Sequence, residues 1–150
     1  MKKMLIVVAD ERRAMLYLSG ALREPFVLVQ TIENDGDAPD RELETDRPGR
    51  KFSSATGQRH ATDGERSTRR TRQEGFARRV AEEIERGRKA GRFDRLVLMC
   101  GARMLGLLRD SLSAPTRDLV LVEVPKDMAQ HDEPAIRAHV PQETWRELGR

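Results

Sequence analysis

Short apolar runs separated by turn residues predict strands in the first part of the chain. Residues 4–9 (MLIVVA) form a continuous apolar run of strand length, as expected for a strand buried on both faces. Residues 13–19 follow a charged turn and predict a second strand that forms a hairpin with residues 4–9. Residues 26–32 predict a third strand, between Pro25 and the turn-forming Asn34-Asp35-Gly36. Because short turns join these strands, we expect them to pair antiparallel.

A long amphipathic helix is predicted after residue 66. Thr71 and Glu74 have the spacing of a capping box, with the first turn beginning there or as early as Ser67, and Gly91 is placed to end the helix. The apolar stripe at helical spacing consists of Phe76, Ala77, Val80, Ala81 and Ile84.

The rest of the chain alternates strands and helices. Residues 96–100 and 119–124 predict buried strands, residues 102–112 and 134–140 predict helices, and residues 142–150 predict a polar tail. The order β-β-β-α-β-α-β-α favours one α/β domain over residues 1–150, with a mixed five-stranded sheet and helices on both faces. That order matches the ribonuclease H-like architecture, which is an argument about fold and not about function.

Residues 34–66 have no apolar periodicity and contain several glycines, prolines and charges, so they predict a long basic loop. Residues 47–72 hold eight basic and two acidic residues, a net charge of +6, whereas the whole chain carries +3. Such a concentration favours contact with phosphate groups and carries no sequence preference. The alternative is a solvated arginine-rich segment without a ligand. The basic residues are Arg47, Arg50, Lys51, Arg59, Arg66, Arg69, Arg70 and Arg72.

Several stretches of the sequence resemble the bacterial host-attachment protein family. The most distinctive is DRPGRKFSS followed by GQRHA, between the predicted sheet and the long helix. The others are LIVVADERRAMLY, GRFDRLVLMCGARMLGLLR and LVLVEVPKDM, so the resemblance extends over nearly the whole chain. Members of that family are similar to the middle domain of archaeal and eukaryotic class-1 translation release factors, which has a ribonuclease H-like fold.

The resemblance implies a site at the tip of the basic loop. In those release factors a Gly-Gly-Gln loop enters the ribosomal peptidyl-transferase centre and helps water to attack peptidyl-tRNA. Gly57 and Gln58 match the second glycine and the glutamine, and Thr56 stands in place of the first glycine, where its side chain restricts the backbone. Gln58 and His60 are therefore the candidate catalytic residues, and hydrolysis of peptidyl-tRNA is the activity to test.

The leading hypothesis is a ribosome-associated or RNA-associated accessory factor in translation stress or rescue, with the ribosome, rRNA or tRNA as partner. Aromatic residues make up only 4% of the chain, so we expect recognition through phosphate and shape instead of base stacking. The candidate nucleic-acid-binding residues are Arg47, Arg50, Lys51, Gly57, Gln58, Arg59, Arg69, Arg70 and Arg72.

Two alternatives remain open. The first is a protein-interaction module that influences attachment indirectly. The second is a metal-dependent nuclease of the ribonuclease H type, which needs carboxylates gathered at strand ends. Asp10, Glu82 or Glu83, and Asp127 are the available acids, but the fourth strand ends in Cys100 instead of an acid. We therefore assign no metal ligands and expect no cofactor.

Cysteine content and hydropathy bear on the compartment. Cys100 is the single cysteine, which excludes an intramolecular disulfide and suits a reducing environment. The N-terminal apolar run is too short for a signal peptide, and no segment approaches the ~20 apolar residues of a membrane span. We expect a cytoplasmic protein without membrane contact.

Overall fold

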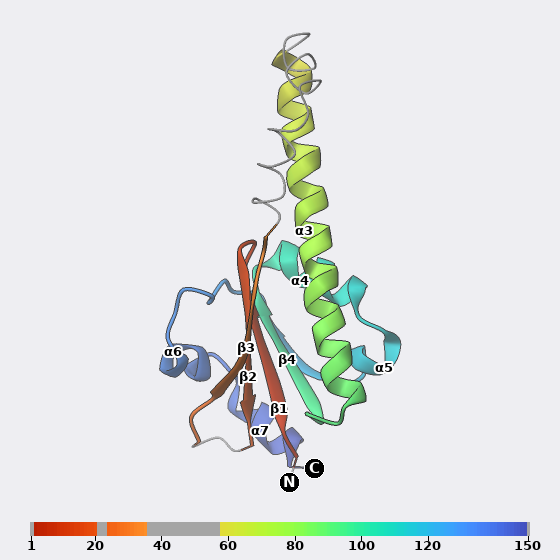
Figure 1. Ribbon diagram of the computed structural model, residues 1–150. Helices are drawn as coiled ribbons and strands as arrows, with labels where there is room; N and C mark the ends of the chain where they lie inside the picture. The colour runs from red at the N-terminus through yellow and green to blue at the C-terminus, as the bar shows by residue number, and fades with distance from the viewer. Residues whose placement is uncertain (1, 21–23, 36–57, 150) are drawn as a thin grey trace.

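A five-stranded mixed sheet forms the centre of the protein (Figure 1). The computed structural model describes residues 2–20, 24–35 and 58–149, with residues 58–63 described by their backbone only. In chain order the strands are β1 (Met4–Ala9), β2 (Arg13–Ser19), β3 (Val27–Glu33), β4 (Arg95–Cys100) and β5 (Val120–Val124). They lie side by side in the order β3-β2-β1-β4-β5.

Strand directions confirm the predicted mixture of hairpins and crossovers. β1 pairs antiparallel with β2, and β2 pairs antiparallel with β3. β1 pairs parallel with β4, and β4 pairs parallel with β5. All six residues of β1 are buried, because β1 is central and its alternate side chains enter two different cores. This order and these directions are those of the ribonuclease H-like architecture.

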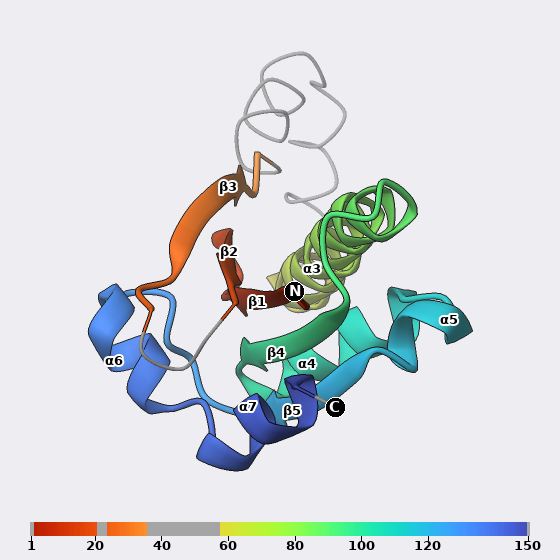
Figure 2. The same ribbon diagram turned by 90° about the horizontal axis from the view of Figure 1, so that it is seen from below.

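Helices cover both faces of the sheet (Figure 2). On one face lie α3 (Gln58–Lys89) and α4 (Ala102–Ser111), which is followed by the short α5 (Ala114–Arg117). On the other face lie α6 (Glu133–Ala138) and α7 (Gln142–Leu148). None of the helices in the described ranges combines the length and the apolarity that crossing a bilayer requires.

The start of α3 corrects the sequence prediction. The helix begins at Gln58, so residues 58–66 of the predicted loop are helical. Thr71 is an interior residue whose hydroxyl donates to the Ser67 carbonyl oxygen at 2.9 Å, so it does not act as a cap. Once the apolar turns that follow are packed on the sheet, each further helical residue adds a hydrogen bond without a new nucleation cost. Extension of this kind requires no apolar pattern. The predicted end is confirmed, because Gly91 has a φ of +68°.

The C-terminal tail corrects a second prediction. Residues 142–148 form α7, which buries Thr144, Trp145 and Leu148 against the sheet. The Trp145 ring lies 5.8 Å from that of Phe26, centroid to centroid, so the last helix closes the second core. Only two large apolar residues lie in this stretch of sequence, which is too few to reveal a helical period.

Candidate nucleic-acid interface

The first half of α3 projects beyond the sheet (Figure 1). Residues 64–71 are exposed, apart from the partly exposed Thr68, and Gln73 is the first buried residue among those of α3 whose side chains are described. Residues 58–72, here called the projecting segment, span about 22 Å at about 1.5 Å per residue. Apart from Glu11, which contacts Arg69, no residue of the described body forms a hydrogen bond or ion pair with the side chains of residues 64–71.

The projecting segment is strongly basic. It contains five arginines and two acidic residues, Asp63 and Glu65, for a net charge of +3. No acidic residue lies in its first turn, so the positive end of the helix dipole adds to the charge of the arginines. The segment is therefore a positively charged protrusion on a folded base.

The described arginines of the projecting segment lie in different environments. Arg69 forms an ion pair with Glu11 of the β1–β2 turn at 3.0 Å, but both side chains are exposed, so the pair contributes little. Arg66 and Arg70 are exposed and form no ion pair with any residue in the described ranges. Arg72 is partly buried where the helix reaches the body. The segment therefore keeps much of its charge for a ligand.

The structure describes only some of the predicted site residues. Arg47, Arg50, Lys51 and Gly57 lie outside the described residues. The backbone of Gln58, Arg59 and His60 forms the first turn of α3. Arg69, Arg70 and Arg72 lie on the same helix, with Arg70 about 16 Å along the axis from Arg59 at about 1.5 Å per residue. One helix thus connects the candidate loop tip with the exposed cations near the body.

A cavity of about 270 Å³ lies at the base of the projecting segment, at the carboxyl ends of β1 and β4. Gln73 is 5% exposed, and its side-chain oxygen accepts a 2.6 Å hydrogen bond from Arg103 Nε of α4. This part-buried contact links α3 to α4 where the long helix leaves the body. Our sequence reasoning missed Gln73, although it lies three residues before Phe76 on the buried face of the helix.

A family model described as "Protein required for attachment to host cells" matches residues 5–140. The chain belongs to this family. The match confirms the resemblance inferred from the sequence. The comparison with curated proteins gives no match.

Two solved structures resemble this host-attachment family protein. One is the archaeal translation termination factor aRF1, with 10% identity and a TM-score of 0.49 over 97% of this chain and 37% of that chain. The other is described as an archaeal protein, with 10% identity and a TM-score of 0.43 over 97% of this chain and 36% of that chain. The chain thus spans little more than a third of the length of either structure.

The carboxylates considered for a nuclease do not assemble in this host-attachment family member. Asp10 and Asp127 line the same cavity at the base of the projecting segment, whereas Glu82 and Glu83 line other grooves. Asp10 caps its own turn, because its Oδ1 accepts from the backbone amides of Arg12 and Arg13 at 2.7 and 2.8 Å. Within the described ranges, no three His, Cys, Asp or Glu residues are placed to hold a metal ion.

The thiol of Cys100 and the imidazole rings of His131 and His139 lie outside the candidate interface, in β4 and around α6. Cys100 is fully buried, and its burial, together with the charges of Glu123 and Asp127, raises the pKa of its thiol to about 12. The thiol therefore stays protonated and packs as a small apolar group. His139 Nδ1 lies 2.8 Å from the Ala135 carbonyl oxygen, and His131 is exposed.

Proposed function

We propose that this host-attachment family protein is an accessory factor that associates with the ribosome or another RNA, in translation stress or rescue. The observation that carries the proposal is the projecting segment, a basic helix on which Arg66 and Arg70 are exposed and form no ion pair with a described residue. The partner is rRNA or tRNA, contacted through its phosphates.

The spacing of the arginines favours a role in binding a ligand over a role in stabilising the helix. Arg66, Arg69 and Arg70 are three and four residues apart, so they lie on one face of the helix. Like charges at this spacing destabilise an isolated helix by about 0.2–0.5 kcal/mol per pair. A polyanion removes that repulsion, and each neutralised phosphate releases bound counterions. The projecting segment is therefore expected to become more stable on binding RNA.

The packed half of α3 supplies the rigidity that such a contact needs. Phe76, Ala77, Val80 and Ile84 are buried against the sheet, and the Gln73–Arg103 hydrogen bond holds the helix where it leaves the body. Fixed cations lose less conformational entropy on binding than cations on a free chain. This arrangement supports a shape-dependent contact with RNA without recognition of a base sequence.

Co-sedimentation with ribosomes at about 50 and 200 mM salt tests this proposal, because binding through phosphates weakens steeply over that range. We expect the Arg66→Ala/Arg70→Ala variant to pellet less and to reduce the salt dependence by about two phosphate contacts. The matched control is Arg78→Ala/Lys89→Ala, which removes two exposed cations from the packed half of the same helix. Equal pelleting of the wild type and the Arg66→Ala/Arg70→Ala variant would refute the proposal.

Release of the peptide from ribosome-bound peptidyl-tRNA is the chemical step to measure. Gln58 is the candidate residue for orienting water, and Thr56 stands where the release-factor loop has its first glycine. If the protein has this activity, Gln58→Ala lowers the release rate while ribosome binding through Arg66 and Arg70 persists. Binding without release in the wild type would restrict the role to that of an accessory factor.

A further inference from the structure

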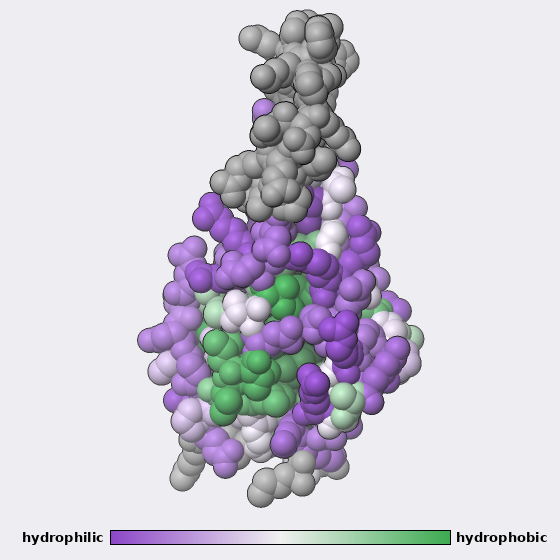
Figure 3. Space-filling view, in the orientation of Figure 1, coloured by the Kyte–Doolittle hydropathy of each residue, from purple (hydrophilic) through white to green (hydrophobic). Residues whose placement is uncertain are grey.

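Among the described residues, the β3 end of the sheet is exposed on the face that carries α3. The edge strand β3 exposes Val27, Leu28 and Val29 at 61%, 50% and 50%. Val27 pairs with Leu18, which packs on the core beneath α3, whereas Leu28 pairs with Tyr17 of the opposite core. Figure 3 shows an apolar patch on this face, over the strands beside α3. Among described residues, two side-chain hydrogen bonds join β3 and α3, one from Gln30 Nε2 to Glu83 at 3.2 Å and one from the Arg79 guanidinium to the Glu33 carbonyl oxygen. Away from these two contacts, a space remains between β3 and α3.

That space is a half-open cavity of about 220 Å³ with an apolar floor. Leu5 and Leu16 of the sheet, with Phe93 beyond the end of α3, are all at most 5% exposed and form its inner surface. Leu18 and Val29 line it toward the β3 edge. An enclosed apolar cavity of about 150 Å³ is enough to bind benzene, so this one has room for an aromatic ring or a short alkyl chain.

The charges around the cavity favour an anion. Lys3 and Arg92 line it, and neither side chain forms an ion pair or hydrogen bond with a residue in the described ranges. Glu83 also lines the cavity, but it is paired with Arg86 and accepts from Gln30. The Asp94 carboxylate accepts from the Lys3 backbone amide at 2.7 Å, so it is engaged with the main chain. The charges left for a ligand are therefore positive.

We propose that this cavity binds a small anionic amphiphile, an acyl chain or aromatic ring that carries a carboxylate. The apolar part lies against Leu16 and Leu18, and the carboxylate faces Lys3 and Arg92. Burial of the chain supplies most of the affinity, and the two cations discriminate the carboxylate from an uncharged analogue. Lys3 and Arg92 lie near the carboxyl end of α3, so this site is separate from the projecting segment at the amino end.

Octanoate and 1-octanol are the probes, because they share an alkyl chain and differ in charge. We expect both to shift the methyl NMR signals of Leu16, Leu18 and Val29 in a saturable way, with a Kd for octanoate on the order of 1 mM. The Lys3→Ala/Arg92→Ala variant is expected to bind octanoate about five-fold more weakly than the wild type, while its affinity for octanol changes by less than about two-fold. Val29→Glu, which places a carboxylate in the cavity wall, is expected to abolish binding of octanoate.

Arg78→Ala/Lys89→Ala is the matched control, because it removes two cations that line a different groove on α3. It is expected to bind octanoate as the wild type does, and circular dichroism checks that each variant is folded. Three results would overturn the proposal. They are the absence of saturable shifts at these methyl groups, shifts confined to other residues, and equal octanoate affinity in the wild type and the Lys3→Ala/Arg92→Ala variant.

Discussion

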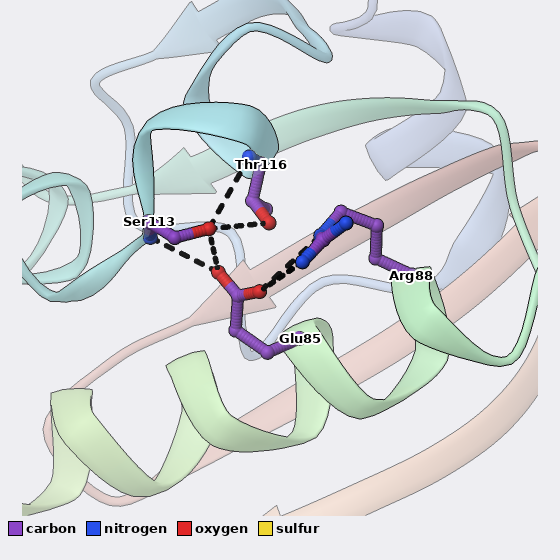
Figure 4. Close-up of polar contacts among 4 residues, drawn as sticks. All are labelled: Glu85, Arg88, Ser113 and Thr116. Carbon is purple, nitrogen blue, oxygen red and sulfur yellow. Dashed lines mark hydrogen bonds and ion pairs between the residues drawn. The ribbon is translucent and has the colours of Figure 1, made fainter.

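Glu85 of α3 joins the long helix to the short helix α5, and its removal is a direct test of how the body is held together (Figure 4). One carboxylate oxygen accepts from the Ser113 amide at 3.0 Å and from the Ser113 hydroxyl at 2.6 Å. The other accepts from Arg88 at 3.2 Å. Ser113 in turn accepts from the Thr116 amide, so Glu85 also holds the cap of α5.

The magnitude follows from the ionisation of Glu85. Burial alone would raise its pKa, but hydrogen bonds from Ser113, Thr116 and Arg88 outweigh burial and lower the pKa from 4.5 to about 2. At 1.36 kcal/mol per pKa unit, that difference corresponds to about 3 kcal/mol. The side chain is 19% exposed, and solvent screening reduces the effect. We expect Glu85→Gln to lower the free energy of unfolding by about 1–2 kcal/mol at pH 7.

The effect has a defined pH dependence. The pKa of Glu85 is lower in the folded than in the unfolded state, so its ionisation stabilises the fold fully above about pH 4.5. That stabilisation is lost as the pH falls through about 2. The difference in stability between the wild type and Glu85→Gln should therefore be constant from pH 7 to about 5 and should shrink toward pH 2.

Urea denaturation followed by circular dichroism between pH 7 and pH 2.5 measures this difference. The control is Glu82→Gln on the exposed side of the same helix, where no hydrogen bond or ion pair involves the carboxylate among described residues. Glu82→Gln should change stability by less than about 0.5 kcal/mol. A Glu85→Gln effect below that size, or one that is unchanged between pH 5 and pH 2.5, would refute the reasoning.

Two further predictions concern the projecting segment and Cys100. Amides of residues 64–71 should exchange with solvent much faster than those of residues 76–84, because only the latter belong to the packed half of α3; equal protection in hydrogen-exchange measurements would contradict this. Cys100 should react with a thiol reagent at pH 8 only after denaturation, because it is buried and its pKa is raised to about 12. Rapid labelling of the native protein would contradict the burial of Cys100.

The sequence by itself determined the central sheet. Residues 4–9 and 96–100 are continuous apolar runs, and a strand that is buried on both faces needs such a run whatever lies beside it. The local sequence also determined the charged turn before Arg13 and the positive φ of Gly91, because each depends on only a few neighbouring residues. The excess of arginine between residues 47 and 72 was visible without a structure as well.

The tertiary structure decided where α3 begins and which of its arginines are exposed. The projecting segment has no apolar stripe, so its helical form depends on the packed turns that follow it and not on its own pattern. The burial of Trp145 and the open cavity beside β3 likewise depend on which elements cover each face of the sheet. The covering of each sheet face depends on the whole tertiary structure, because it is set by contacts between residues that are far apart in the chain.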